Sequence, residues 1–495
     1  MQKTKQLISP IVLSATASMA GVYIASKTSY WQIVLIAFSI MLIYFLIKNP
    51  KNIAVYIAVI FFIILFLLTK LDVTRHAKFQ EFVRPDVQQY GDINIDIYGK
   101  VVDITHQNQT ITIRCYTING EKVTGNIDAF EFENVFDLKY GDYIFMEGTT
   151  TIDMVPRSNN IDYIRNKLSL HKYLIVSSKN YEVEKSSYSS ANFFYNVRQS
   201  INECYDKLFP EKLSALAKAF TLGDKSGFDI ETKENIKDSG LSHVFAISGL
   251  HLGIISIFLM WGLGRFVYKS KIKNALVILI IILFMFIVGY SPSVLRSGIM
   301  MLMYLSAFFF DRRGDSLTAV LFSIIIVLIL FPFALFTASF TLSYGAIFSI
   351  ILLFFPLSKI KAKIPKTIGS ILTSLTCAIG TSIFAAYFFN TINFTSIWAT
   401  IILTPLIFIT IASLYLIYFI NLISFGIAVF FSNCLVPVMQ TLLWSIEKLT
   451  LTKTAIYPAT PNFWVFIAFA SILYCLHIIL KKGVIPWLND QLKPS

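Results

Sequence analysis

The chain has 495 residues, 55% of them hydrophobic and only 14% charged, with a net charge of +13. A soluble domain carries about a quarter charged residues, so the composition excludes an ordinary soluble protein. The positive charge is compatible with nucleic-acid binding, but basic residues also collect in the cytoplasmic loops of membrane proteins. Apolar runs long enough to span a bilayer favour the second explanation.

Three apolar runs, near residues 9–27, 31–48 and 52–69, predict an N-terminal transmembrane region over residues 1–70. Lysines flank the turn between the second and third runs, which places that turn and the N-terminus in the cytoplasm by the positive-inside rule. Three crossings then place the next segment outside the membrane.

Residues 80–180 lack long apolar runs and alternate apolar with polar positions. Period-two segments with regular turns predict about five strands in a small extracytoplasmic β-barrel of the OB type. The predicted turns are Asn119-Gly120, Gly125-Asn126, Gly141-Asp142 and Glu147-Gly148.

Acidic residues outnumber basic ones by 13 to 6 over residues 81–160, which makes this barrel a poor electrostatic guide for a polyanion. Its aromatic residues could stack bases, but period-two aromatics are more often core residues. They are Tyr90, Tyr98, Tyr116, Phe130, Phe132 and Phe136.

Residues 190–240 are mixed and charged with helical spacing, and predict amphipathic helices on the outer surface. Residues 241–432 are almost continuously apolar and predict a second transmembrane region, in which 396–432 is too long for one crossing. Residues 433–495 predict an interfacial helix over 433–450 and a last transmembrane helix.

The breaks between apolar runs from residue 244 onward are basic, and counting crossings places all of them in the cytoplasm. They are Lys269, Lys271 and Lys273; Arg312 and Arg313; Lys359, Lys361, Lys363 and Lys366; and Lys481 with Lys482. The predicted fold is therefore a polytopic α-helical membrane protein of about twelve spans with both termini inside and one inserted extracytoplasmic β-barrel.

The densest polar segment, residues 238–253, stands where a membrane helix is expected to begin. Ser248 and His251 are three residues apart and share one helical face, so they could form a nucleophile–base pair. No nearby acid orients the imidazole, which favours a role in satisfying backbone or lining a polar path. Gly249 and Gly253 form a G-x-x-x-G step that predicts close helix packing.

A second polar cluster covers residues 289–298. Pro292 is expected to break the helix after Ser291, and Arg296 follows one turn into the next helix. A guanidinium in a membrane needs a partner, water or an anion, unless it reaches the interface along its own stem.

Several kinds of site have no motif here. Cys115, Cys204, Cys377, Cys434 and Cys475 are scattered, so neither a zinc site nor a disulfide framework is predicted. There is no G-x-x-x-x-G-K-[ST] loop and no H-E-x-x-H helix. We therefore expect no cofactor, no metal and no enzymatic activity in this chain. The residues by themselves leave open whether it is a channel or a transporter.

The run from Leu241 to Gly253, LSHVFAISGLHLG, resembles the signature of the ComEC family of competence proteins. The segments 221–227, 290–298 and 339–344 resemble further family motifs in the same order. Thr341 and Ser339 depart from the Gln and Gly that the last motif usually carries. The resemblance covers roughly residues 80–435.

This resemblance implies a channel domain over residues 241–432 that takes up single-stranded DNA across the bacterial cytoplasmic membrane during transformation. It implies an external DNA receptor, a cytoplasmic helicase-like ATPase and, in one option, a homodimer. Many relatives continue into a metallo-β-lactamase-like domain that this sequence lacks, so a separate nuclease is expected. The residues expected to line the DNA path are Ser242, His243, Ser248, His251, Ser291 and Arg296. Gly249, Gly253 and Pro292 are expected to act in helix packing or as hinges.

Two alternatives remain. A small-molecule permease on the same scaffold would change substrate accumulation and leave DNA uptake untouched. An intramembrane hydrolase would need Ser248 as its nucleophile and His251 as its base.

Overall fold

The computed structural model describes fourteen stretches of the chain, and they fall into two compact units. The first unit combines residues 1–199 with 283–337, and the second combines 200–282 with 338–495. The described residues are 19, 53–81, 93–105, 110–130, 138–150, 172–185, 190–245, 247–289, 291–310, 316–357, 366–390, 392–450, 455–456 and 463–481. The predicted runs 9–27 and 31–48 lie almost wholly outside them.

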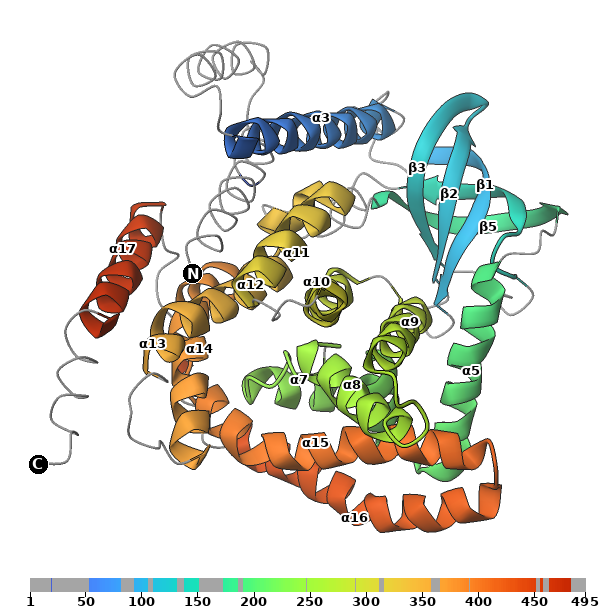
Figure 1. The fold of residues 1–495 in the computed structure, drawn as a ribbon. Coiled ribbons are helices and arrows are strands. Elements are labelled where there is room, and N and C mark those ends of the chain that lie inside the picture. Colours follow the sequence, from blue (N-terminus) through green and yellow to red (C-terminus); the bar gives the residue numbers. More distant parts are fainter. Residues whose placement is uncertain are drawn as a thin grey trace, which may run out of the picture. The chain divides into compact units, whose positions relative to one another are not determined.

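Five strands of the first unit close into a barrel (Figure 1). The order around it is β1-β2-β3-β5-β4, with β1 paired to β4 and every pair antiparallel except β3–β5. The strands are β1 Ile93–Thr105, β2 Thr110–Ile118, β3 Glu121–Phe130, β4 Tyr143–Thr150 and β5 Lys172–Lys185. Alternate apolar side chains such as Ile95, Ile97, Ile111 and Ile113 fill its interior, because successive residues of a strand face opposite sides.

Two of the four predicted turns lie where the sequence placed them, and two do not. Asn119 and Gly120, with φ of 49° and 80°, form the β2–β3 hairpin, and Gly141 has φ of 100° just before β4. The predictions at Gly125 and Gly148 were wrong, because both residues lie inside strands. At Gly148 an added Cβ would come within 2.7 Å of the Ser177 carbonyl oxygen, so this glycine permits a close approach of β5.

Helices complete the first unit. The long α3, Ile53–Glu81, packs against α11, Ser316–Leu330, and against strands of the barrel. Two further segments, α10 (Pro292–Ser306) and η4 (Pro332–Phe336), pack against α11. The short η3 is Ala307–Phe310.

The second unit is helical (Figure 1), and α6, α8, α15 and α16 share its hydrophobic core. Its elements are the end of α5 (Ser190–Leu208), α6 Glu211–Leu222, α7 Ile230–Asp238, α8 Gly249–Leu263, most of α9 (Ser270–Val288), α12 Ala338–Ser349, η5 Ile350–Phe354, α13 Phe355–Leu357, α14 Lys366–Phe389, α15 Thr395–Asn421, α16 Phe425–Thr450 and α17 Phe463–Ile479. A small two-stranded sheet joins β6 Ile392–Asn393 to β7 Ala455–Ile456.

Within the described residues, five helices are long and apolar enough to cross a membrane. They cover Ser270–Val288, Ala338–Leu357, Ile368–Phe389, Thr395–Asn421 and Phe425–Thr450. Each of these helices also exposes large apolar side chains, for example Trp398, Ile402 and Phe430, as expected of helices whose outer surface meets lipid. The chain is a membrane protein, mostly helical, with a small sheet domain.

Two predicted helical segments differ from those in the structure. The chain does break within 396–432, but at residues 422–424, and α16 then runs unbroken from Phe425 to Thr450. Residues 433–450 are therefore part of a spanning-length helix and not a separate interfacial one. Within 190–240, α6 buries most of its residues, including Leu216 and Phe220, in the core of the second unit, so it is not a surface helix.

Candidate functional site

The polar segment before α8 is a series of tight turns. Helix α7 ends at Asp238, and Gly240, with φ of 75°, redirects the chain. The backbone N–H of Val244 then donates to the carbonyl of Leu241 at 2.9 Å. Helix α8 begins at Gly249, with Ser248 as its N-cap.

Ser248 and His251 close the start of α8 as a capping pair. The Ser248 hydroxyl accepts from the N–H of Leu250 at 3.3 Å, and the N–H of Ser248 donates to His251 Nδ1 at 3.2 Å. Because a donor points at Nδ1, we assign the proton of the neutral ring to Nε2. His251 has no exposed surface. This geometry satisfies helix-terminal backbone groups, and it leaves the imidazole no access to a substrate.

The turn after α6 packs against this segment. Gly223, with φ of 72°, ends α6 and donates its N–H to the carbonyl of Ala219 at 3.1 Å. A Cβ at Gly223 would lie 3.1 Å from Ile247 Cγ1. The two motifs, separate in sequence, therefore meet within the second unit.

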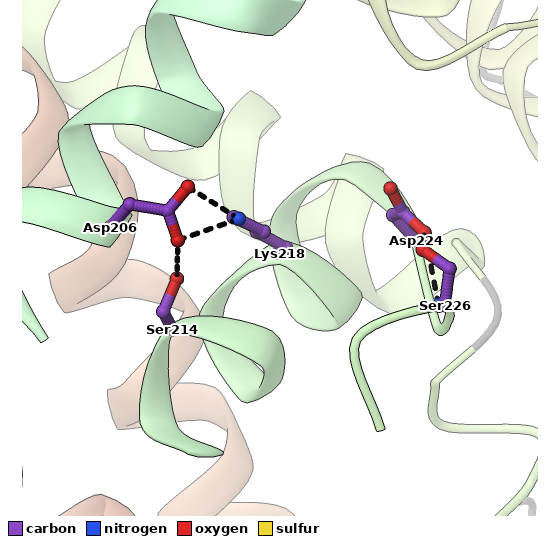
Figure 2. Close-up of polar contacts among 5 residues, drawn as sticks. All are labelled: Asp206, Ser214, Lys218, Asp224 and Ser226. Atoms are coloured by element: carbon purple, nitrogen blue, oxygen red, sulfur yellow. Dashed lines mark hydrogen bonds and ion pairs between the residues drawn. The ribbon is translucent and has the colours of Figure 1, made fainter. Parts of the chain in front are cut away.

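Asp224 and Ser226 give the turn its shape (Figure 2). The Ser226 N–H donates to Asp224 Oδ1 at 3.1 Å, and the Ser226 hydroxyl donates to the same oxygen. This is a local aspartate turn, in which both hydrogen bonds keep the Asp224 carboxylate next to Ser226.

Lys225 lies between these two residues and links the turn to the next motif. Its Nζ donates to the carbonyl of Ser242 at 3.3 Å. Burial lowers the pKa of Lys225 from its usual value. Sequence reasoning missed this residue, although the Gly-Asp-Lys-Ser-Gly run that contains it was recognisable as a turn.

Ser242 and His243 are exposed on the same segment. The His243 Nδ1–H donates to the carbonyl of Gly240 at 3.0 Å, which leaves Nε2 available. Protein atoms around the imidazole lower its pKa by desolvation, the bond to Gly240 raises it, and the nearby Lys225 cation lowers it further.

Buried aromatic residues next to the two turns pack against one another. The rings of Phe220 and Phe245 stack with centroids 4.8 Å apart, and Phe228 meets Phe245 edge-on at 5.7 Å. All three residues are buried. Each such ring pair stabilises the fold by about 1 kcal/mol beyond the burial of its apolar surface. The polar turns are therefore attached to a well-packed core.

An ion pair and two tyrosines fix the surrounding helices. Lys218 Nζ lies 2.7 Å from both carboxylate oxygens of Asp206, which also accepts from Ser214 Oγ at 2.7 Å (Figure 2). Burial raises the pKa of Asp206, but the hydrogen bonds from Lys218 and Ser214 outweigh it and hold the pKa below its usual value. The hydroxyl of Tyr205 donates to the Leu414 carbonyl, and that of Tyr415 to the Thr221 carbonyl, each at 3.2 Å.

Arg296 belongs to the first unit. Gly289, with φ of 93°, ends the preceding helix, and Ser291 caps α10 by accepting from the N–H of Val294 at 3.4 Å. Pro292 is the first residue of α10, and Arg296, one turn later, is only 3% exposed. The predicted path residues thus form two groups. Ser291 and Arg296 lie in the first unit, and the second unit holds Ser242, His243, Ser248 and His251.

Of the two glycines predicted to pack closely, Gly253 does not do so in the structure. Nothing lies within 4 Å of a Cβ added at Gly253, so no described neighbour in this chain uses it as a contact. The close approach occurs between α12 and α14, where a Cβ on Gly380 would lie 2.6 Å from the Gly345 carbonyl oxygen.

A group of tyrosines lies on the outer face of the barrel. Tyr98, Tyr116 and Tyr143, on β1, β2 and β4, have ring centroids 6.2 to 6.4 Å apart. Lys100 Nζ lies 5.4 Å from the Tyr143 ring centroid. Alternation along each strand identified Tyr98 and Tyr116 as candidates, but only strand pairing brings Tyr143 to them.

Metal-binding clusters are a separate question. Within the described ranges, no group of three or more His, Cys, Asp and Glu side chains is placed to hold a metal ion.

Comparison with known proteins identifies the family. The model of a family described as "Competence protein" matches residues 220–483, more than half of the chain. "ComE operon protein 3" of Bacillus subtilis (strain 168) is 30% identical over 218 residues, which cover 43% of this chain and 28% of that protein. An "Uncharacterized protein" of Aquifex aeolicus (strain VF5) is 30% identical over 217 residues, which cover 43% of this chain and 50% of that protein.

The chain thus matches half or less of the length of these two relatives. No solved structure is significantly similar to it. The family match includes both polar motifs of the second unit, from the turn at Thr221–Gly227 to the start of α8. The chain therefore belongs to the Competence protein family, of the ComEC type that its motifs resemble.

Proposed function

We propose that this protein takes part in DNA uptake during competence, as the channel through which single-stranded DNA crosses the cytoplasmic membrane. The observation that carries the proposal is the family match over residues 220–483, which contains the half-buried Lys225 and the exposed Ser242 and His243. A single strand carries about one negative charge per nucleotide. Its path therefore needs hydrogen-bond donors that bind the phosphates weakly enough for the strand to move on.

The finer architecture belongs to the same proposal. We assign the barrel to the OB type, because its strand order 1-2-3-5-4 with β3 parallel to β5 matches a five-stranded barrel of that kind. We also propose about twelve spans, both termini in the cytoplasm and the barrel outside, following the distribution of basic turns. An external DNA receptor and a helicase-like ATPase would act with this chain.

A permease on the same scaffold is the competing function. It predicts that deletion alters accumulation of a small molecule while DNA uptake is unchanged. An intramembrane hydrolase fits less well, because His251 is fully buried and its Nδ1 is engaged by the backbone of Ser248.

The decisive experiment follows labelled transforming DNA into nuclease-protected cytoplasm in cells lacking this gene and in complemented cells. The proposal predicts that DNA stays bound outside the deletion strain and enters after complementation. Unchanged internalisation in competent cells would leave the permease as the leading function.

Arg296 provides a residue-level test of the proposed path. Replacing a buried guanidinium by an apolar side chain removes a fixed cation from the membrane region. We expect Arg296→Leu to reduce uptake at least tenfold at normal protein level, and Arg296→Lys to retain part of it because a cation remains. Wild-type uptake by Arg296→Leu would exclude this residue from the path.

A further inference from the structure

Lys225 is a cation that has no matching acid among the described residues. Within the part of the chain that the structure describes, no carboxylate lies at ion-pair distance from its ammonium. A lysine ammonium has three N–H groups, and the Ser242 carbonyl accepts one of them at 3.3 Å. The ammonium of this half-buried side chain therefore has donor capacity left for a ligand.

The neighbouring acid is held elsewhere. Asp224 precedes Lys225, but its Oδ1 accepts both the N–H and the hydroxyl of Ser226. Figure 2 shows the Asp224 carboxylate hydrogen-bonded to Ser226. The turn thus separates two opposite charges that stand side by side in sequence.

A second basic group stands next to this cation. His243 follows Ser242, whose carbonyl Lys225 binds, and the residue is exposed although protein atoms partly desolvate its ring. The bond from Nδ1 to Gly240 fixes the ring and leaves Nε2 free to meet a ligand. Two partly desolvated basic groups repel each other when both are charged, and a bound anion would relieve that repulsion.

We propose that Lys225, with His243 beside it, binds a phosphodiester group of the single-stranded DNA backbone. This inference rests on the proposed uptake function and adds to it the group that meets the phosphate. Lysine contacts phosphate as a point charge without demanding one fixed geometry. A single such contact is weak enough for a strand that must move on. The competing explanation is that Lys225 only ties the turn at Thr221–Gly227 to the Ser242 carbonyl.

The test compares Lys225→Gln with Lys233→Gln in the full chain, purified in lipid nanodiscs. Glutamine can still donate to the Ser242 carbonyl but carries no charge, so a purely structural role survives the change. Lys233 is exposed on α7 of the same unit and serves as the matched charge control. Binding of fluorescein-labelled oligothymidylate is measured across a salt series.

We expect Lys225→Gln to weaken binding by about tenfold. The slope of log affinity against log salt should fall by about 0.7, the contribution of one phosphate contact on a single strand. Lys233→Gln should match wild type, and Lys225→Arg should retain the slope. With an uncharged methylphosphonate oligomer, wild type and Lys225→Gln should bind alike.

A measurement on the unmodified protein covers the case in which Lys225→Gln fails to fold. Amine-reactive labelling followed by mass spectrometry should show that oligothymidylate protects Lys225 and not Lys233. Wild-type binding with equal slopes for both glutamine variants, or with no protection of Lys225, would overturn this inference and leave the uptake function standing. Failure of the wild type to bind the charged oligomer would overturn it as well, while the uptake assay judges the channel separately.

Discussion

The polar residues at the start of α8 show how a chemically suggestive pair can serve a local structural need. A serine and a histidine three residues apart fit a nucleophile with its base, and the distance between Ser248 Oγ and His251 Nδ1 is 3.2 Å. The same two residues also satisfy backbone groups that a helix leaves unpaired at its N-terminus. Because His251 is fully buried, the capping role is favoured over a catalytic one.

Ser248→Ala tests this assignment. The change removes the acceptor for the Leu250 N–H, and we expect a loss of about 1 kcal/mol in the free energy of unfolding. Ser248→Asn should recover most of it, since asparagine is an equally good cap. Unfolding in detergent, followed by circular dichroism, measures both. A fully stable Ser248→Ala protein that has lost an activity would instead support the nucleophile.

Asp206 gives the second residue-scale prediction, a dependence of stability on pH. Its folded-state pKa lies below its usual value, so its contribution is present above the unfolded pKa of about 3.9 and is lost as the pH falls through the folded pKa. We expect the wild-type unfolding temperature to fall more steeply below about pH 4 than that of Asp206→Asn. Lys218→Gln removes the partner and should flatten the profile in the same way. Parallel profiles for all three proteins would show that the pair contributes nothing.

At the scale of elements, the contact between α12 and α14 is set by small residues. A Cβ at Gly380 would meet Ser349 Oγ and come within 2.6 Å of the Gly345 carbonyl oxygen, and one at Gly345 would lie 2.9 Å from the Gly380 carbonyl oxygen. Without a hydrophobic force between helices in lipid, such close approach is what holds them together.

Gly380→Ala and Gly369→Ala are a matched pair on α14. The first places a methyl group into this contact, and we expect it to cost about 1–3 kcal/mol. The second meets nothing within 4 Å, so alanine should be neutral or gain up to about 1 kcal/mol from helix propensity. Thermal unfolding of the two purified variants measures the difference. Equal stability would mean that the helices separate without cost.

The π-helical turn η5 is a second feature of element scale. It interrupts the helix Ala338–Leu357, and the Nδ1–H of His477 on α17 donates to the carbonyl of Leu352 within it at 2.7 Å. A π turn leaves backbone carbonyls displaced from the regular pattern. The last helix thus attaches to its unit through one of them.

For the whole molecule, the strongest sequence-based expectation concerns sidedness. The hairpin of the barrel should be outside the membrane, and the basic turn with Lys269, Lys271 and Lys273 should be inside. Both regions are exposed in the structure, which makes them suitable for chemical labelling.

Cysteine labelling tests that topology. In a variant whose five native cysteines are replaced by alanine, Glu121→Cys should react with a membrane-impermeant maleimide in intact cells. Lys271→Cys should react only after permeabilisation. The reverse pattern would invert the topology, and labelling of both in intact cells would place them on one side.

The bilayer requirement, the strands of the barrel and a helix start at each polar cluster, near residues 248 and 291, could be predicted from the sequence. Each of these follows from rules that act within a few residues: apolar length, period-two alternation, and the unpaired backbone at a helix end. The incorrect turn predictions at Gly125 and Gly148 show where these local rules fail. Glycine occurs both in turns and in strands that another strand approaches closely, so its presence does not distinguish the two.

The folded chain alone shows which distant segments meet. It joins Lys225 to Ser242, Thr221 to Tyr415 and Gly345 to Gly380, and it places Tyr143 beside Tyr98 and Tyr116. These contacts depend on how whole helices and strands pack, and packing is set by the shape of every neighbouring side chain at once. That is why the sequence showed a conspicuous Ser–His pair, while the cation that we propose meets the phosphate became visible only in the folded chain.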